Sequence, residues 1–154
     1  MKNKNFTKII AVFLVIAIAL VIFIFIYKNN KPNSQNNNVN INTEVEGNKQ
    51  DLIYFSITPG QKVSGLTTFV GSVKNAYFFE ANILVNVLDA NKNVLKSGHA
   101  NATTDWMTTE PVSFEGNIDF SGLPKGPAYI EIHNDNASGL PENDKNILIP
   151  IIIE

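Results

Sequence analysis

The sequence of 154 residues contains no cysteine and no arginine, and it has only two histidines. The absence of cysteine excludes disulfides, thiolate metal sites and cysteine nucleophiles. Two histidines leave little for a histidine-based metal site. These absences argue against most enzymes, and we expect neither catalytic residues, nor a metal or other cofactor, nor a small-molecule substrate.

The charges are distributed unevenly along the chain. Before residue 51 there are six lysines and two acidic residues. From Asp51 onward there are six lysines and twelve acidic residues, so this part carries a formal charge of 6 − 12 = −6. An acidic domain without arginine repels a phosphate backbone, which argues against nucleic-acid binding.

One long apolar run, Ile9 to Tyr27, contains 19 residues without charge, glycine or proline. As a helix rising ~1.5 Å per residue it would span ~28 Å, close to the ~30 Å hydrocarbon core of a bilayer. Three lysines in residues 1–8 outweigh Lys28 and Lys31 on the other side, so the positive-inside rule places residues 1–8 in the cytoplasm. We therefore predict a single-pass signal anchor at residues 9–27 of the cell membrane, with an extracytoplasmic C-terminal domain.

A cleaved signal peptide is the alternative, since it too begins with basic residues and an apolar run. Ala17-Ile18-Ala19 has the small-x-small form of a cleavage site. This triplet lies inside the run, and large apolar residues follow it up to Ile26, whereas a cleavage site normally ends the apolar region. An uncleaved anchor is therefore the favoured interpretation.

Residues 28–50 are dominated by asparagine, with Val39, Ile41 and Val45 as the only large apolar residues. Such a segment cannot bury enough surface to offset the entropy of ordering it. We predict a flexible linker over residues 28–50, which leaves residues 51–154 as the folded domain.

From residue 51 onward the apolar residues recur with a period of two, which is typical of half-buried strands. The clearest alternation runs from Val112 to Phe120. A second alternation places Phe79, Ala81, Ile83, Val85 and Val87 on one face, and a third places Ala128, Ile130 and Ile132 on one face. Further strands are predicted at Leu52–Thr58, Leu66–Val73, Val94–Ala102 and Ile147–Ile153.

About seven short strands without a helical period between them predict an all-β domain. The expected fold class is an antiparallel β-sandwich, preceded by one transmembrane helix. Pro150 cannot donate a ladder hydrogen bond, so we expect it at an edge or a bulge. The single tryptophan, Trp106, is expected to pack between the sheets near Phe79 and Phe114.

Several motifs follow one another in order between Ser56 and Glu154: Pro59-Gly60-Gln61-Lys62-Val63, Phe78-Phe79-Glu80-Ala81-Asn82, Leu88-Asp89-Ala90-Asn91, Asp105-Trp106-Met107, Asp135-Asn136-Ala137-Ser138-Gly139-Leu140-Pro141-Glu142-Asn143-Asp144 and Ile149-Pro150-Ile151. Through these motifs the sequence resembles the immunoglobulin-like domain of bacterial spore germination proteins. The resemblance implies that the predicted fold is an immunoglobulin-like antiparallel β-sandwich, and that the domain is an extracytoplasmic, non-enzymatic module of the cell envelope. The GerMN domain that often accompanies this family in envelope proteins is not in the sequence, so the family name by itself does not imply a role in germination.

The candidate partner contacts lie on the face opposite the expected core and in one polar loop. Period-two alternation turns Phe78 away from the core on the same side as Leu84 and Leu88, and this outer face is apolar enough to be a contact surface. The loop at Asp135–Asp144 is the second candidate. The residues that we select for partner contact are Phe78, Glu80, Leu84, Leu88, Asp135 and Asn136.

Two motifs have a chemical interpretation beside a structural one. His133 near Asp135 could act as a general base, but no nucleophile motif accompanies it, and a solvated strand face is favoured. The loop Asn134 to Lys145 has offsets loosely like those of an EF-hand, but a lysine stands where calcium needs a bidentate glutamate. Asn, Asp and Ser build such loops through hydrogen bonds to the main chain, which is the favoured interpretation.

Three functional hypotheses remain from the sequence. The leading one is a single-pass membrane protein whose outer domain binds an envelope protein or the cell wall, with the anchor raising the effective concentration. The second is a cell-wall hydrolase with Glu80, Glu131 or Asp135 as acid and base, which would need ~5–9.5 Å between carboxylates and a cleft for substrate. The third is a passive structural spacer.

Overall fold

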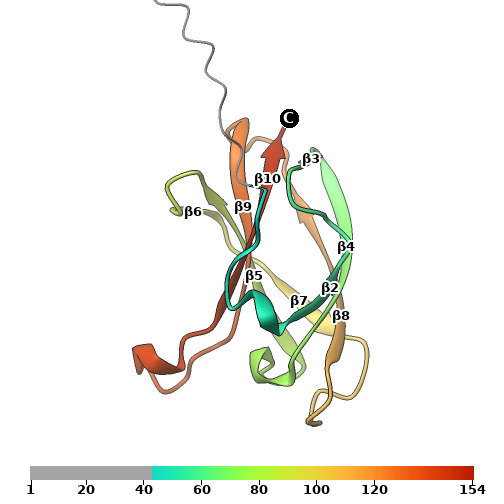
Figure 1. Ribbon diagram of the computed structural model, residues 1–154. Helices are drawn as coiled ribbons and strands as arrows, with labels where there is room; N and C mark the ends of the chain where they lie inside the picture. Colours follow the sequence, from blue (N-terminus) through green and yellow to red (C-terminus); the bar gives the residue numbers. More distant parts are fainter. Residues whose placement is uncertain (1–42) are drawn as a thin grey trace, which may run out of the picture. The chain divides into compact units, whose positions relative to one another are not determined.

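The structure, a computed structural model, describes residues 43–154 of the chain (Figure 1). The predicted cytoplasmic segment 1–8, the predicted membrane helix 9–27 and most of the predicted linker 28–50 lie outside the described residues. Within residues 43–154, no helix is long and apolar enough to cross a membrane.

The described part consists of strands joined by turns and by three short 3-10 helices (Figure 1). It contains ten strands, more than the seven expected. The strands are β1 (Glu46–Gly47), β2 (Leu52–Phe55), β3 (Gln61–Val63), β4 (Leu66–Val73), β5 (Asn82–Asp89), β6 (Val94–Lys96), β7 (His99–Ala102), β8 (Val112–Asp119), β9 (Gly126–His133) and β10 (Asn146–Ile153), and the 3-10 helices are η1 (Lys49–Asp51), η2 (Asn75–Tyr77) and η3 (Pro141–Asn143).

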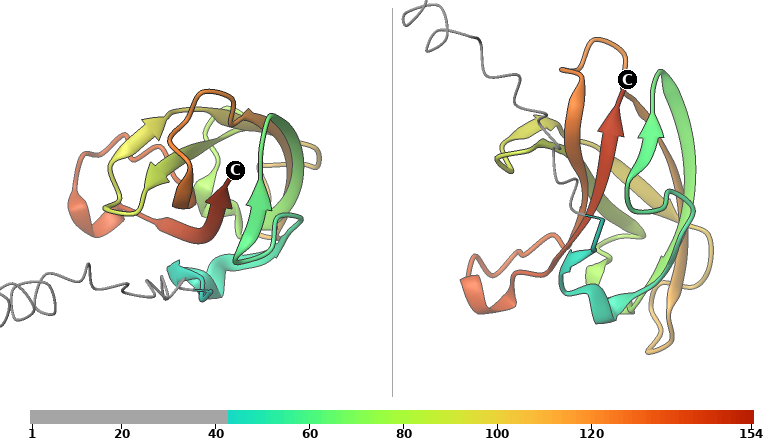
Figure 2. Two further views of the ribbon diagram at one scale, coloured as in Figure 1. Left: turned by 90° about the horizontal axis from the view of Figure 1, so that it is seen from above. Right: turned by 45° about the horizontal axis from the view of Figure 1, so that its top comes forward.

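All ten strands belong to one sheet that curls around the core. Its order is β1-β10-β9-β5-β7-β8-β4-β2, with β3 added to β10 and β6 added to β5. The half formed by β10, β9 and β5 lies across the core from the half formed by β8, β4 and β2 (Figure 2). The pairing is antiparallel except between β3 and β10, which are parallel. The predicted all-β, antiparallel class is therefore confirmed, with one parallel pair that the sequence did not indicate. The two sheets expected of a sandwich are here the two halves of one curled sheet.

The core is filled by side chains that alternate along the long strands. Phe55, Phe69 and Phe114 form an aromatic cluster, with ring centroids 5.3 to 6.3 Å apart. Burying each ring removes ~150–250 Å² from water, and the tilted and edge-on contacts add to that gain. The remaining core is mainly aliphatic, and its fully buried members include Val73, Ile83, Val85, Val87, Ile130, Ile132, Ile147, Ile149 and Ile151.

The long strands lie where the period-two pattern predicts them. Strand β4 has the predicted bounds, and β8, β9 and β10 agree to within a residue or two. The predicted strand Val94–Ala102 is instead two strands, β6 and β7, separated at Ser97 and Gly98. The break has a structural reason, because β6 pairs only with β5 whereas β7 pairs with β5 and also with β8 in the other half.

The domain begins before residue 51. Strand β1 pairs with β10, and the amide of Asn48 donates to the carbonyl of Asn146 over 2.8 Å. Residues 46–50 therefore belong to the folded domain, although the sequence places them in the linker. The composition is linker-like because this segment is held by main-chain hydrogen bonds, which any residue type supplies.

Pro150 lies in β10, which has neighbours on both sides. On one side it is opposite Tyr129 of β9. On the other side the ladder is interrupted between β1, which reaches Leu148, and β3, which begins opposite Ile151. The Pro150 carbonyl accepts from the amide of Gly60 there. Strand β10 is therefore an interior strand with a continuous ladder to β9, and the prediction of an edge or a bulge at Pro150 is wrong. The proline is accommodated because its missing N–H falls at a local gap in the ladder on the other side.

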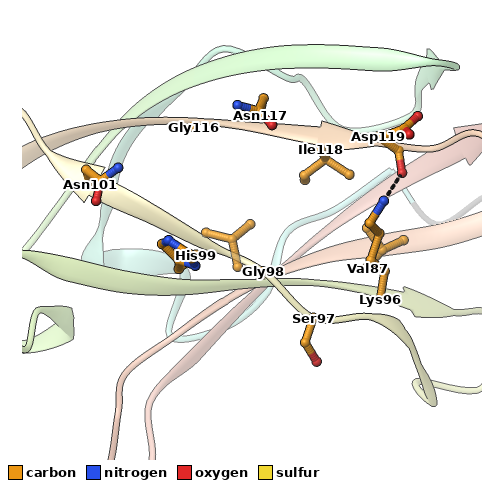
Figure 3. A pocket seen from close by; sticks show the side chains of 11 residues that line it. Val87, Lys96, Ser97, Gly98, His99, Asn101, Gly116, Asn117, Ile118 and Asp119 are labelled. Carbon is orange, nitrogen blue, oxygen red and sulfur yellow. Dashed lines mark hydrogen bonds between the residues drawn. The ribbon is translucent and has the colours of Figure 1, made fainter.

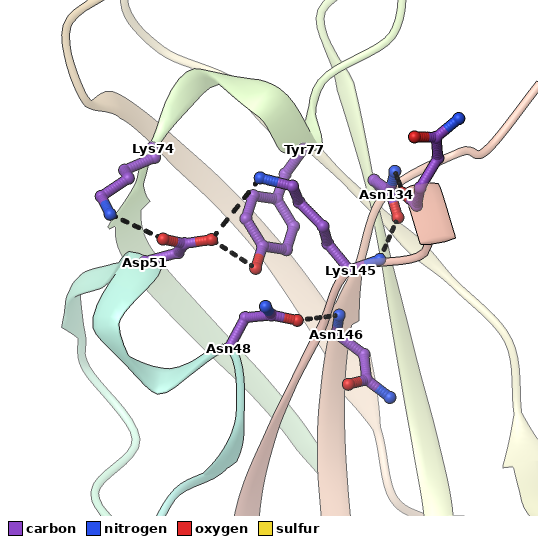
Figure 4. A network of polar contacts seen from close by, with 8 residues as sticks. Asn48, Asp51, Lys74, Tyr77, Asn134, Lys145 and Asn146 are labelled. Atoms are coloured by element: carbon purple, nitrogen blue, oxygen red, sulfur yellow. Dashed lines mark hydrogen bonds and ion pairs between the residues drawn. The ribbon is translucent and has the colours of Figure 1, made fainter. Parts of the chain in front are cut away.

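A buried carboxylate, Asp51, ties η1 to the rest of the domain (Figure 4). The Lys74 ammonium donates to it over 2.7 Å, the Tyr77 hydroxyl over 3.4 Å, and the Lys145 ammonium lies 3.8 Å away. The hydrogen bond from Lys74 lowers the pKa of Asp51 more than burial raises it. Tyr77 is 1% exposed, and its burial together with the neighbouring Asp51 charge raises its pKa.

Candidate functional site

The approach to β5 is a tight turn and not an extension of the strand. The amides and carbonyls of Phe79 and Asn82 exchange hydrogen bonds of 2.9 Å in both directions, which leaves Glu80 and Ala81 as a two-residue turn. Both turn residues have positive φ, +47° and +64°, as a type I′ turn requires. Such φ values are uncommon for residues other than glycine and asparagine. The backbone of this turn is therefore strained, and the surrounding structure holds it in this conformation.

The turn presents Phe79 to solvent beside a shallow hollow. We use the name Phe79 hollow for this depression of about 340 Å³, and its lining residues are Phe79, Glu80, Asn82, Leu84, His99 and Asp135. Phe79 is 51% exposed, although the alternation predicted it in the core. Three elements meet here, because Leu84 of β5 is directly opposite His99 of β7 and Asp135 comes from the loop after β9.

Three of the six selected contact residues, Glu80, Leu84 and Asp135, line the Phe79 hollow. Phe78 does not, because it is partly buried and its ring lies 6.2 Å from that of Phe114 in an edge-on contact. Leu88 is only 3% exposed, so it cannot act as an outer contact in this conformation. The selection of Phe78 and Leu88 as exposed contacts is therefore wrong.

The error at Phe78 and Phe79 has a single cause. The apolar alternation predicts a strand that already includes residue 79, but the strand begins at Asn82. A two-residue turn at Glu80 and Ala81 breaks the period, so Phe78 instead of Phe79 packs against the core. The sequence carries no signal for this turn, because neither residue is the glycine or asparagine that normally marks type I′.

Asn136, the sixth selected residue, belongs to the loop between β9 and β10 and is used by that loop. Its amide donates to the Leu140 carbonyl over 2.8 Å and to Asp144 over 2.6 Å, and its oxygen accepts from the Ser138 hydroxyl. Asn134 similarly donates to the Asn143 carbonyl and accepts from the Lys145 amide. These contacts are those of a loop closed by its own side chains, as the structural interpretation of the sequence expected.

His133 lies on the outer face of β9 in a small polar cluster. Its Nδ1 is 3.0 Å from the Asn134 carbonyl and its Nε2 is 3.1 Å from the Asn86 amide nitrogen. Because the carbonyl accepts and the amide donates, these contacts fit a neutral ring protonated at Nδ1. The same Asn86 amide donates to Glu131 over 3.0 Å. The arrangement satisfies the buried Asn86 and the half-buried Glu131 and His133, and within residues 43–154 no serine or threonine hydroxyl makes a hydrogen bond to His133.

Two further predictions concern metal binding and Trp106. In the part of the chain from 43 to 154, no three His, Asp or Glu side chains are grouped so that they could hold a metal ion. Trp106 was expected in the core, but it lies partly buried in the loop between β7 and β8, outside the core cluster. The core position is instead taken by Phe55, which comes from β2 and completes the aromatic cluster with Phe69 and Phe114.

The Phe79 hollow combines groups suited to surface recognition. Phe79 and Leu84 offer apolar area, and Asn82 and His99 offer donors and acceptors. Glu80 and Asp135 add acceptors with negative charge. An exposed aromatic residue beside such polar groups is the usual composition of a contact hot spot.

The curled antiparallel sheet defines this protein as an all-β domain. Residues 56–139, more than half of the chain, match the family model described as the immunoglobulin-like domain of bacterial spore germination, and the chain belongs to that family. Neither the curated proteins nor the solved structures include a significant match to this chain. The family predicted from the sequence motifs is thus confirmed.

Proposed function

We propose that this protein is a non-catalytic interaction module of the bacterial cell envelope, anchored in the membrane by residues 9–27 and binding its partner through the Phe79 hollow. The observation that carries the proposal is Phe79 itself, which is 51% exposed directly before a turn of two positive-φ residues. A large apolar side chain held outward at a local backbone cost is expected where contact with a partner offsets that cost.

The partner class that fits best is a component fixed in the envelope, either the wall or another membrane protein. The hollow is small, so the intrinsic affinity is expected to be weak. An anchor at residues 9–27 would confine the domain to a shell around the membrane, and the asparagine-rich linker would set the radius of that shell. Confinement raises the effective concentration of domain and partner, so weak intrinsic binding suffices.

The test is co-sedimentation of the full-length protein, in detergent, with isolated cell-wall sacculi over a range of salt. Retention of the wild-type chain that survives salt, reduced about tenfold by Phe79→Ala, is the expected result, because truncation of a central aromatic contact typically costs ~1–2 kcal/mol. Leu66→Ala is the matched control, since Leu66 is 72% exposed on β4, away from the residues that line the hollow.

The remaining outcomes separate the alternatives. A chain that stays in the supernatant overturns direct wall binding, and the membrane fraction is then tested for a protein that cross-links near Phe79. Function in cells that tolerates Phe79→Ala together with Leu84→Ala indicates a passive spacer. Soluble muropeptides released from the sacculi, and abolished by Glu80→Gln or Asp135→Asn, would indicate a hydrolase that uses the two carboxylates of the hollow.

A further inference from the structure

Strand β8 has an edge that is only partly paired. On one side it pairs with β4 over its full length, from Val112 to Asp119. On the other side its ladder with β7 holds only two residue pairs, which end at Glu115 opposite Asn101. The four residues Gly116–Asp119 continue the strand for ~13 Å, and within residues 43–154 their second edge has no partner strand.

This edge lines the largest hollow described in the domain, about 460 Å³ (Figure 3). We use the name β7–β8 gap for it. Gly116–Asp119 form one wall, and the break between β6 and β7 at Ser97 and Gly98 forms the other. The apolar side chains of Val85, Val87 and Ile118 line the gap between these walls, and all three are at most 7% exposed.

One side chain crosses this gap. The ammonium of Lys96 donates to the main-chain carbonyl of Asp119 over 2.6 Å (Figure 3). This contact satisfies one acceptor at the end of β8 with a side chain instead of a strand. An unpaired strand edge is a template for another extended chain, and natural domains often block such edges with a lysine.

We propose that the β7–β8 gap binds an extended peptide segment of a partner protein, which adds as a strand to the free edge of β8. Main-chain groups of Gly116–Asp119 would pair with the main chain of the segment, and an alternate small apolar side chain would enter between Val85, Val87 and Ile118. This is strand addition, in which main-chain hydrogen bonds supply affinity and pockets for alternate side chains supply specificity.

The geometry selects a free segment over a second folded copy. The gap is bounded by Gly116–Asp119 on one side and by Ser97 and Gly98 on the other, so an occupant has to fit between these two walls. The outer strand β2 of a second copy is already paired with β4 on one edge, and it is continuous with its own domain. A loop or tail of a partner that has no sheet of its own meets no such restriction.

The proposal is tested by selecting binders from a library of random nine-residue peptides displayed on phage, with the full-length protein in detergent as target. Enriched peptides are synthesised, and the amide hydrogen exchange of the protein is measured with and without them. We expect alternating apolar positions in the peptides and slowed exchange confined to residues 96–101 and 116–119. Methylation of alternate main-chain nitrogens in the peptide should abolish binding, because it removes ladder donors while keeping the side chains.

Lys96 supplies a matched pair of variants. Lys96→Met removes the ammonium that occupies the Asp119 carbonyl. A selected peptide should then bind about three- to tenfold more tightly, because it no longer has to displace a charge-assisted hydrogen bond. Lys125→Met is the control, since Lys125 is exposed and lies outside the residues that line the gap. Equal affinities for Lys96→Met, Lys125→Met and wild type would contradict the proposed position of the strand.

Other outcomes overturn the proposal in distinguishable ways. Peptides that protect residues 79–84 and leave 116–119 unchanged would place binding at the Phe79 hollow, which supports the proposed function but not strand addition. A third outcome is that residues 116–119 are already protected from hydrogen exchange in the free full-length chain and lose this protection when residues 28–42 are deleted. This result would show that a segment of the same chain fills the gap. Failure to enrich any peptide that protects residues 116–119 would also refute the proposal.

Discussion

Replacing Asp51 with asparagine tests whether a single buried carboxylate fastens the N-terminal edge of the domain. The Asp51 side chain is 7% exposed, and it receives the Lys74 ammonium at 2.7 Å and the Tyr77 hydroxyl at 3.4 Å. Asparagine keeps the shape and one acceptor oxygen but removes the charge. The Tyr77 hydroxyl therefore keeps a partner, whereas the ion pairs with Lys74 and Lys145 are lost.

The expected cost follows from the exposure of the partners. A hydrogen bond to a charged group contributes ~1.5–3 kcal/mol, and exposed ion pairs contribute ~0–1 kcal/mol. Lys74 is 51% exposed and regains water when the carboxylate is removed. The cost of losing the charge of Asp51 is therefore expected near the boundary of these two ranges. We expect Asp51→Asn to lower the free energy of unfolding by ~1–2 kcal/mol. Asp51→Ala should cost ~1 kcal/mol more, because it also leaves the buried Tyr77 hydroxyl without its acceptor.

The charge also predicts how this cost depends on pH. The folded-state pKa of Asp51 is lowered from the ordinary value of 3.8, so between these two values the unfolded chain binds more protons than the folded chain. The stabilisation is fully present above about pH 5 and is lost as the pH falls through the folded-state pKa. The difference between wild type and Asp51→Asn should therefore be constant near neutrality and shrink below pH 3.8.

Urea unfolding followed by fluorescence of the single tryptophan, Trp106, measures both quantities. Glu142→Gln is the control for loss of one negative charge, since Glu142 is exposed and outside this network. If Asp51→Asn unfolds within 0.5 kcal/mol of wild type at pH 7, or if the difference does not change between pH 6 and pH 2.5, the reasoning from burial and pairing is wrong.

Two further predictions concern the main chain. Gly71→Ala should lower the free energy of unfolding by ~2–3 kcal/mol, because a Cβ there would lie 2.8 Å from Phe114 Cε1 and 2.9 Å from Phe55 Cδ2. Gly98→Ala should lower it less, because the nearest neighbour of a Cβ there is the Val85 carbonyl at 3.1 Å, and equal effects of the two substitutions would contradict the packing described. Ala81→Gly should raise the midpoint of thermal unfolding by a few degrees, because glycine relieves the backbone strain of a φ of +64°. Ala76→Gly, at a position without positive φ, should lower the midpoint. A lower midpoint for both variants would show that the turn is not strained.

Strands β8 and β9 could be predicted because each buries one face over its whole length. In β8, Val112, Phe114 and Ile118 are buried while Glu115 and Asn117 are exposed, which is the alternation written in the sequence. The same holds for Ala128, Ile130 and Ile132 of β9. Where burial on one side determines which residues are apolar, composition and period are sufficient to locate a strand.

Strands β1 and β3 could not be predicted because their role rests on the main chain. Strand β3 runs parallel to β10 with Gln61 and Lys62 exposed, so its side chains carry no pattern. Strand β1 has only two residues, one of them glycine. Both are specified by free hydrogen-bonding groups along the edge of β10, which lie about a hundred residues away from β1 and cannot be seen in the local sequence.

The candidate site illustrates how a local irregularity decides a functional assignment. The sequence correctly brought attention to the segment from Phe78 to Leu84, yet it assigned the wrong phenylalanine to the surface, because a slip of one residue exchanges the two faces of a strand. The exchange arises at Glu80 and Ala81, two residues with positive φ that no composition rule marks as a turn. A turn of ordinary type I′ sequence would have been recognisable and less strained. Glu80 and Ala81 therefore explain why the sequence did not predict this surface, and their strained backbone is what indicates it in the structure. Because of this turn, the binding proposal depends on Phe79 and not on Phe78.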